Sequence, residues 1–208
     1  MKPIMAFVLF FLAAASLCAQ ATSTPTPDMT QVTRVANQGL VTLRALAEKA
    51  PSALGLTAKE AAEARLGPPL RIFHVPLDRL RTYRPEEDPR ALLRDIQSFF
   101  YPVVVGAEVR SSLTVKQQSG QWVASDFGQS ALSKQVSTAR GEASGPETTL
   151  VRVPALNVYF IGRTNGTFTL TPVTELHGLE YPVGRPAAAA DVFRALSAIA
   201  EKLKGDPT

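Results

Sequence analysis

The chain has 208 residues, of which 45% are hydrophobic and 19% are charged. Lys and Arg together number 22 and Asp and Glu 18, which gives a formal net charge of +4 at pH 7. These proportions are ordinary for a globular protein and exclude disordered, collagen-like and polytopic membrane proteins. The single cysteine excludes a disulfide framework and a cysteine-based zinc site.

The first residues have the pattern of an export signal. Lys2 supplies a positive start, Ile4–Leu17 is apolar apart from one serine, and Ala19-Gln20-Ala21 has the small-x-small pattern that signal peptidase accepts. The apolar run is shorter than the roughly 20 residues that a membrane-spanning helix needs. We therefore predict a signal peptide over residues 1–21, no membrane span after its cleavage, and a periplasmic or secreted protein of a bacterial envelope.

Cys18 falls inside the predicted signal. A bacterial lipoprotein signal has a small residue directly before its cysteine, whereas the bulky Leu17 stands there, so the sequence disfavours lipidation. Cleavage after Ala21 would remove Cys18 and leave a mature chain without disulfides. Such a chain depends on its hydrophobic core for stability, and it is long enough to build one.

The charge pattern bears on possible partners. Residues 71–94 are the densest basic stretch, but acidic residues alternate with the basic ones there. This interleaving is typical of a solvated surface and differs from the continuous basic stripe that follows a phosphate backbone. We therefore expect no nucleic-acid binding.

Residues 22–27 are rich in Thr and Pro and are predicted to form a flexible tether, and residues 28–208 to form a single domain. Apolar spacing and capping residues predict five helices: from Asp28 or Thr30 to Ala50, Ala58–Leu66 with a Thr57–Glu60 capping box and a Gly67 cap, Asp88–Pro102, Ser130–Ala139 and Ala187–Lys204. Pro76–Glu87 is predicted to be a loop.

Short β-rich segments predict the strands: Leu70–Val75, Val103–Val105, Glu108–Lys116, Gln121–Phe127, Leu150–Val153, Leu156–Gly162 and Thr167–Val173. Hairpins interspersed with helices indicate an α+β fold. We expect a mainly antiparallel sheet of about six strands, with N-terminal, interspersed and C-terminal helices.

The hairpin at Ser119-Gly120 has two possible registers. A two-residue loop would pair Leu113 with Asp126 and place an acid beside a buried leucine, whereas a bulged turn shifts the pairing by one residue. The shifted register is predicted because it puts Leu113 and Val115 on one face with Val123 and Phe127. The opposite face would then hold Trp122, Arg110, Thr114 and Asp126.

A second hairpin is predicted at Asn165-Gly166, where a two-residue turn would pair Ile161 with Leu170. Tyr159, Ile161, Phe168 and Leu170 would form one apolar face, and Phe160 would point to the other. In both hairpins, an aromatic side chain would thus point away from the face that carries most of the apolar residues. Helices could cover this side, or it could be an open face that binds a partner or ligand. The candidate binding residues are Trp122, Phe160, Arg110 and Thr114.

Candidate catalytic residues are few. His74 stands between apolar residues of a predicted strand, which favours a structural role, whereas His177 lies in a loop near Glu175 and Glu180. These three are the candidates for acid/base chemistry, but they do not make up the set of three or four ligands that zinc takes. No nucleophile elbow, phosphate-binding loop or dinucleotide motif is present, so we predict no metal and no cofactor.

The sequence therefore favours an exported, non-catalytic domain that binds an unidentified protein or envelope ligand through a sheet face. One alternative is a periplasmic hydrolase that uses His177 and a loop carboxylate. Another is a propeptide-like inhibitor or folding helper, which would need an exposed edge strand.

Overall fold

A computed structural model describes residues 26–141 and 147–203 of the chain. Within these ranges, six α-helices and a nine-stranded, mostly antiparallel sheet confirm the predicted α+β class, with more strands than the sequence suggested. The predicted signal peptide with Cys18, and most of the predicted tether, lie outside the described residues. No helix in the described part of the chain is long and apolar enough to cross a bilayer.

The sheet runs in the order β5-β4-β3-β2-β6-β7-β8-β9, with β1 paired to β3. Among the strand pairs of the described residues, β2 and β6 run parallel and the others are antiparallel. The strands are β1 (Arg65–Leu66), β2 (Leu70–His74), β3 (Arg94–Val105), β4 (Glu108–Gln118), β5 (Gln121–Gly128), β6 (Thr148–Val153), β7 (Val158–Asn165), β8 (Thr167–Pro172) and β9 (Ala187–Ala188).

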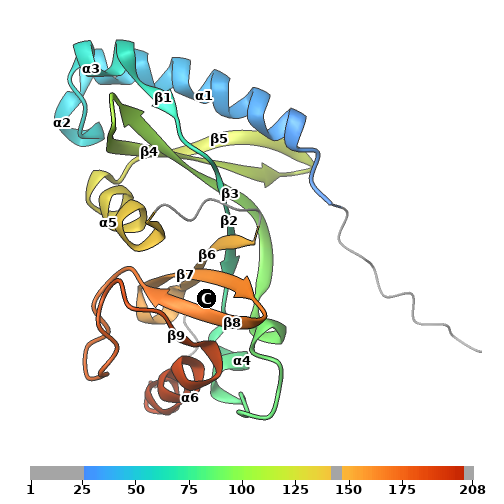
Figure 1. Cartoon of the computed structure of the whole chain (residues 1–208). Helices are drawn as coiled ribbons and strands as arrows, with labels where there is room; N and C mark the ends of the chain where they lie inside the picture. The colour runs from blue at the N-terminus through green and yellow to red at the C-terminus, as the bar shows by residue number, and fades with distance from the viewer. Residues whose placement is uncertain (1–25, 142–146, 204–208) are drawn as a thin grey trace, which may run out of the picture.

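The sheet is strongly curved, and helices cover both of its faces (Figure 1). On the outer face, α1 (Met29–Lys49), α2 (Pro51–Leu54) and α3 (Ala58–Glu63) cover the β3–β5 half, and α4 (Leu77–Arg81) and α6 (Ala189–Ala200) cover the other half. The concave inner face carries α5 (Ser130–Arg140), between the two halves. Part of the concave face lies beside α5, and the candidate site described below is located there.

The first helices largely follow their capping signals. The Asp28 carboxylate accepts a hydrogen bond from the Thr30 N–H at 2.9 Å and begins α1, and both hydrogen bonds of the predicted capping box between Thr57 and Glu60 are present in α3. However, α3 ends at Glu63, because Arg65–Leu66 leaves the helix to pair with β3. The prediction that Gly67 caps this helix is therefore wrong.

The predicted helix over Asp88–Pro102 is also wrong. Asp88 caps only a 3-10 turn (Pro89–Leu92), and the chain then enters the twelve-residue strand β3. Apart from Pro102, residues 99–105 are all aromatic or β-branched, which fits a strand that is flanked by neighbours on both sides, and this tertiary setting overrides the helical spacing. The predicted loop over Pro76–Glu87 contains α4, whose Leu77 and Leu80 are buried.

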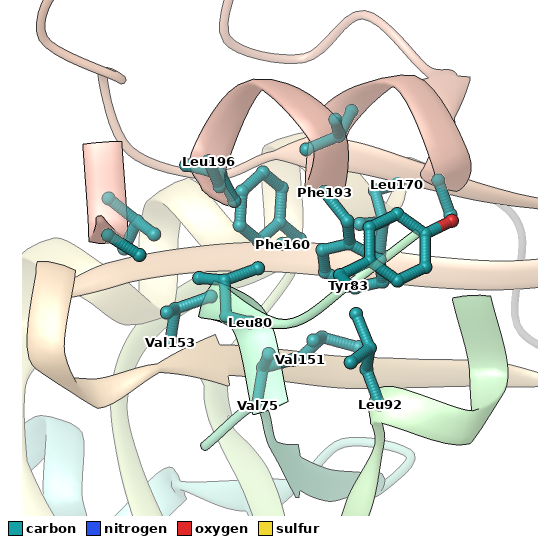
Figure 2. Packing of buried hydrophobic residues seen from close by; sticks show 14 of the residues in the cluster. Val75, Leu80, Tyr83, Leu92, Val151, Val153, Phe160, Leu170, Phe193 and Leu196 are labelled. Atoms are coloured by element: carbon teal, nitrogen blue, oxygen red, sulfur yellow. The ribbon is translucent and has the colours of Figure 1, made fainter. Parts of the chain in front are cut away.

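In the part of the chain that the structure describes, three clusters of buried side chains form the core. One lies between α1–α3 and the outer face, and another lies on the inner face beneath α5. Figure 2 shows the third, in which Phe160 and Phe193 meet between the sheet and α6. Tyr83 packs edge-on against Phe193 with ring centroids 5.9 Å apart, which ties the segment after α4 to α6.

Candidate functional site

The concave face contains a cavity of about 300 Å³ that is bounded by strands β2 to β7 and by α5. Its apolar wall consists of Ile72, Ile96, Phe100, Leu132 and Leu150, most of which belong to the core cluster beneath α5. Its polar lining consists of His74, Ser98, Thr114, Lys116, Asp126, Gln129, Arg152 and Tyr159. An apolar cavity with a few convergent polar groups is the usual form of a small-molecule site.

The polar end of the cavity is built from one row of residues across four strands. His74 pairs with Arg94 of β3 on one side and with Arg152 of β6 on the other, and Arg152 pairs with Tyr159 of β7. Side chains of register partners point to the same face of a sheet, so all four belong to the inner face. The parallel pairing of β2 with β6 is what brings His74 beside Arg152.

A bulge opens the sheet next to this row. Ile72 of β2 pairs with Ser98 of β3, but the next residue, Phe73, pairs with Asp95. Ile96 and Gln97 are therefore left without partners on β2. Gln97 has a φ of 48°, a left-handed conformation that is uncommon for a residue other than glycine. The Asp95 carboxylate holds this backbone, because it accepts a hydrogen bond from the Gln97 N–H at 2.9 Å. Bulges of this kind re-aim side chains, often beside functional sites.

The same Asp95 carboxylate forms a 2.6 Å ion pair with Arg71, which fixes it from the other side. Ile96 and Gln97 line a neighbouring, wider hollow of about 770 Å³ that also contains Arg94. His74 and Ile96 line both spaces, so the imidazole stands at the boundary between the cavity and this hollow.

Arg152 is the most informative group in the cavity. Its guanidinium carbon lies 5.2 Å from the centroid of the Tyr159 ring, within the range of a cation–π contact. Its Nε is buried and has no hydrogen-bond partner among the described residues. Because a buried donor without an acceptor costs free energy, an unpartnered one in a cavity wall calls for an explanation.

The electrostatics of the row follow from its composition. Burial lowers the pKa of His74 below its ordinary value, and the charges of Arg152 and Arg94 lower this pKa further. His74 is therefore a neutral imidazole at neutral pH, able to donate or accept a hydrogen bond. The fixed charges of the cavity lining are then those of Lys116, Arg152 and Asp126.

The structure corrects the predicted hairpin at Ser119-Gly120. The loop has two residues, both with positive φ, and Val115 pairs with Ala124 while Gln117 pairs with Trp122. A bulge further along β4, between Leu113 and Val115, restores the pairing of Leu113 with Phe127. The pairing of Leu113 with Asp126, which we expected a bulged turn to prevent, is therefore prevented by a bulge inside β4.

Trp122 consequently lies on the outer face. It packs against Phe99 with ring centroids 5.7 Å apart, at the margin of the core cluster beneath α1. Arg110 is also engaged elsewhere, since it forms a 2.9 Å ion pair with Glu60 of α3 and contacts Glu108 at 3.4 Å. Of the four predicted binding residues, only Thr114 lines the cavity on the inner face.

The predicted register at Asn165-Gly166 is wrong as well. Ile161 pairs with Thr171, Gly162 pairs with Leu170, and Gly166 alone separates the last paired residues. This one-residue shift exchanges the two faces, so that Phe160 joins Phe168 and Leu170 beneath α6. Phe160 is fully buried, and it therefore does not share an open sheet face with Trp122.

His177 is exposed in the segment after β8. It lines a surface hollow of about 420 Å³ with Glu175, and another of about 540 Å³ with both Glu175 and Glu180. No group of three or more His, Cys, Asp or Glu side chains in residues 26–141 and 147–203 could hold a metal ion. The hydrolase alternative stays a prediction.

Sequence reasoning missed His74 and Arg152 as site residues. One signal was available, because Arg152 is a charged residue inside the apolar strand segment 150–153 and interrupts its pattern. The row itself depends on pairings between segments that are far apart in the chain. No protein-family model, curated protein or solved structure matches this chain.

Proposed function

We propose that this domain binds a small ligand in the cavity on the concave face of its sheet, without transforming it chemically. The proposal retains the sheet-face binding favoured by the sequence but relocates it from Trp122 and Phe160 to His74, Arg152 and Lys116. The observation that carries it concerns Arg152, a residue that lines the cavity and whose buried Nε has no acceptor among the described residues.

Two further features support a binding role. Strands β2 to β7 together with α5 surround the cavity, and groups on rigid elements are held more precisely than groups on loops. The left-handed backbone of Gln97 costs free energy. Its N–H donates to Asp95, which Arg71 in turn holds through an ion pair. Such local strain clusters at ligand sites, where the surrounding structure maintains it.

The proposal is tested by fragment screening of the ¹⁵N-labelled protein with NMR. We expect fragments that bind to shift the Arg152 Nε–H signal and the imidazole signals of His74, and to leave His177 unchanged. The same screen with the Arg152→Gln variant serves as the control, and in it these fragments should no longer bind. Shifts confined to His177, Glu175 and Glu180 would instead favour the hydrolase alternative and contradict the proposal.

The inhibitor alternative has its own readout. β5 stands at one end of the strand order and, within the described residues, pairs with β4 alone, so an added strand would pair along its free edge. A protein partner that protects the backbone amides of residues 121–128 from hydrogen exchange, and leaves the cavity unchanged, would favour that alternative.

We also propose that the domain works outside the cytoplasm, on the basis of the apolar run and small-x-small pattern in residues 1–21. Expression of the full chain in a bacterium, followed by N-terminal sequencing of the processed protein, tests this. A mature protein that begins at Thr22 is expected, and an unprocessed chain in the cytoplasm would contradict it.

A further inference from the structure

We infer that the ligand is a monocarboxylate with a compact apolar group. This inference rests on the proposed function, because it names the chemical class that the cavity takes. It combines two features of the same cavity, its cationic end and its apolar wall, which together select an anion that also has a hydrophobic body.

The fixed charges of the lining favour an anion. Lys116 and Arg152 are cationic, and no ion pair engages either of them within the described residues. Asp126 is the one carboxylate in the lining, and it is exposed and accepts a hydrogen bond from the Ser125 hydroxyl at 2.8 Å. Arg94 stands beyond His74 in the row and adds to the positive potential.

The geometry of Arg152 suits a carboxylate. Its contact with the Tyr159 ring restrains the guanidinium plane, and its unpartnered Nε lies on the edge that offers Nε–H and Nη–H side by side. Such an edge matches the two oxygens of a carboxylate in a bidentate pair. The neutral His74 beside it can donate one further hydrogen bond to the same group.

The remaining wall distinguishes a carboxylate with a hydrophobic body from a bare anion. Ile72, Phe100 and Leu150 are buried residues of the wall, and Leu132 of α5 lines the same cavity and packs against their cluster. Inorganic phosphate would meet the cations but has no apolar group to pack against this wall. A ligand that buries the wall gains about 25 cal/mol for each Å² of apolar surface removed from water.

The volume sets the size of the apolar group. A cavity of about 300 Å³ lies at the lower end of the range for small-molecule sites. It therefore suits a single ring or a short branched chain. We choose benzoate as the probe, with benzamide as its neutral isostere and inorganic phosphate as an anion without an apolar body.

The test titrates each probe onto the whole protein while NMR records the Arg152 Nε–H signal and the His74 imidazole. We expect saturable binding of benzoate, and binding of benzamide and phosphate that is at least about tenfold weaker, since a charge-assisted hydrogen bond or the apolar contact is lost in each. Arg152→Gln should weaken benzoate about tenfold or more, whereas Arg34→Gln, an identical charge change on the exposed surface of α1, should have no effect.

Lys116→Gln provides a second variant should Arg152→Gln fail to fold, and it should weaken benzoate severalfold. Equal binding of benzamide would overturn the role of the cations, and equal binding of phosphate would overturn the role of the apolar wall. If benzoate leaves both signals unchanged while a neutral fragment shifts them, the inference fails and the proposed function stands. If no compound of the fragment screen shifts them, the proposed function itself fails.

Discussion

Arg152 and Tyr159 are register partners on β6 and β7, and the guanidinium carbon of the one lies 5.2 Å from the ring centroid of the other. The contact places the cation against an aromatic face, and the buried Nε of the same side chain has no acceptor in the described residues. The pair thus links the packing of the sheet to the chemistry of the candidate site, and it can be tested separately from Arg152.

Tyr159 should hold Arg152 in place through its ring, without contacting the carboxylate of a ligand. We expect Tyr159→Phe to keep benzoate affinity, because the ring remains, and Tyr159→Leu to weaken it severalfold, because the cation–π contact of about 0.5–1 kcal/mol is lost. Titration of benzoate onto both variants measures this. Equal losses in the two variants would show that the hydroxyl matters and the ring does not.

His74 should make stability fall in mild acid. Its pKa in the folded protein lies below the ordinary 6.5, so the unfolded chain binds more protons as the pH falls through about 6.5. The free energy of unfolding should therefore decrease between about pH 7.5 and 5.5 in the native protein, and decrease less in His74→Gln. Urea unfolding across this range measures both slopes.

The charged groups around the two spaces that His74 borders are Arg94, Arg152, Asp78, Asp95, Lys116 and Asp126. These groups are unchanged in His74→Gln. The difference between the pH slopes of the native protein and of this variant therefore measures the contribution of the His74 imidazole alone. A native slope in His74→Gln would contradict the prediction.

Gly39 allows α1 to approach β5 closely. A Cβ built at this position would lie 2.7 Å from the Cβ of Ala124, which is closer than two such atoms can stand. Gly39→Ala should therefore destabilise the protein by about 1–2 kcal/mol, because overpacking outweighs the gain of about 1 kcal/mol in helix propensity. Urea unfolding of Gly39→Ala tests this, and adding Ala124→Gly should restore most of the loss.

Phe160 should be a core residue with no part in ligand binding. It is fully buried between the sheet and α6, so Phe160→Ala should cost about 3–5 kcal/mol in the free energy of unfolding. Phe160→Leu, which keeps most of the volume, should cost much less. A variant that unfolds like the native protein in urea would show that this cluster is misassigned.

Trp122 should contribute to stability and leave the cavity unaffected. It packs against Phe99 on the outer face, opposite the candidate site, so Trp122→Ala should lower the free energy of unfolding by about 1–3 kcal/mol. Benzoate affinity should stay at the native value. A loss of affinity at unchanged stability would instead support the original prediction that Trp122 contacts a ligand.

Local signals in the sequence predicted much of the fold. The caps at Asp28 and Thr57, the helix after Gln129 and the two turns at Gly120 and Gly166 all lie where residue chemistry places them, because a cap or a tight turn depends on a few neighbouring residues. The helix predicted over Asp88–Pro102 failed for the converse reason, since β2 and β4 supply the flanking strands that make this segment a strand.

By itself, the sequence determined the fold class, the start of α1 and α3 at their caps and the positions of the hairpins, since all of these follow from local backbone preferences and side-chain periodicity. Only the tertiary structure decided the strand registers, and with them the face to which each side chain points. A shift of one residue buried Phe160, and a parallel pairing between distant segments set His74 beside Arg152. The candidate site is a product of register, and register is set by the packing of the whole sheet.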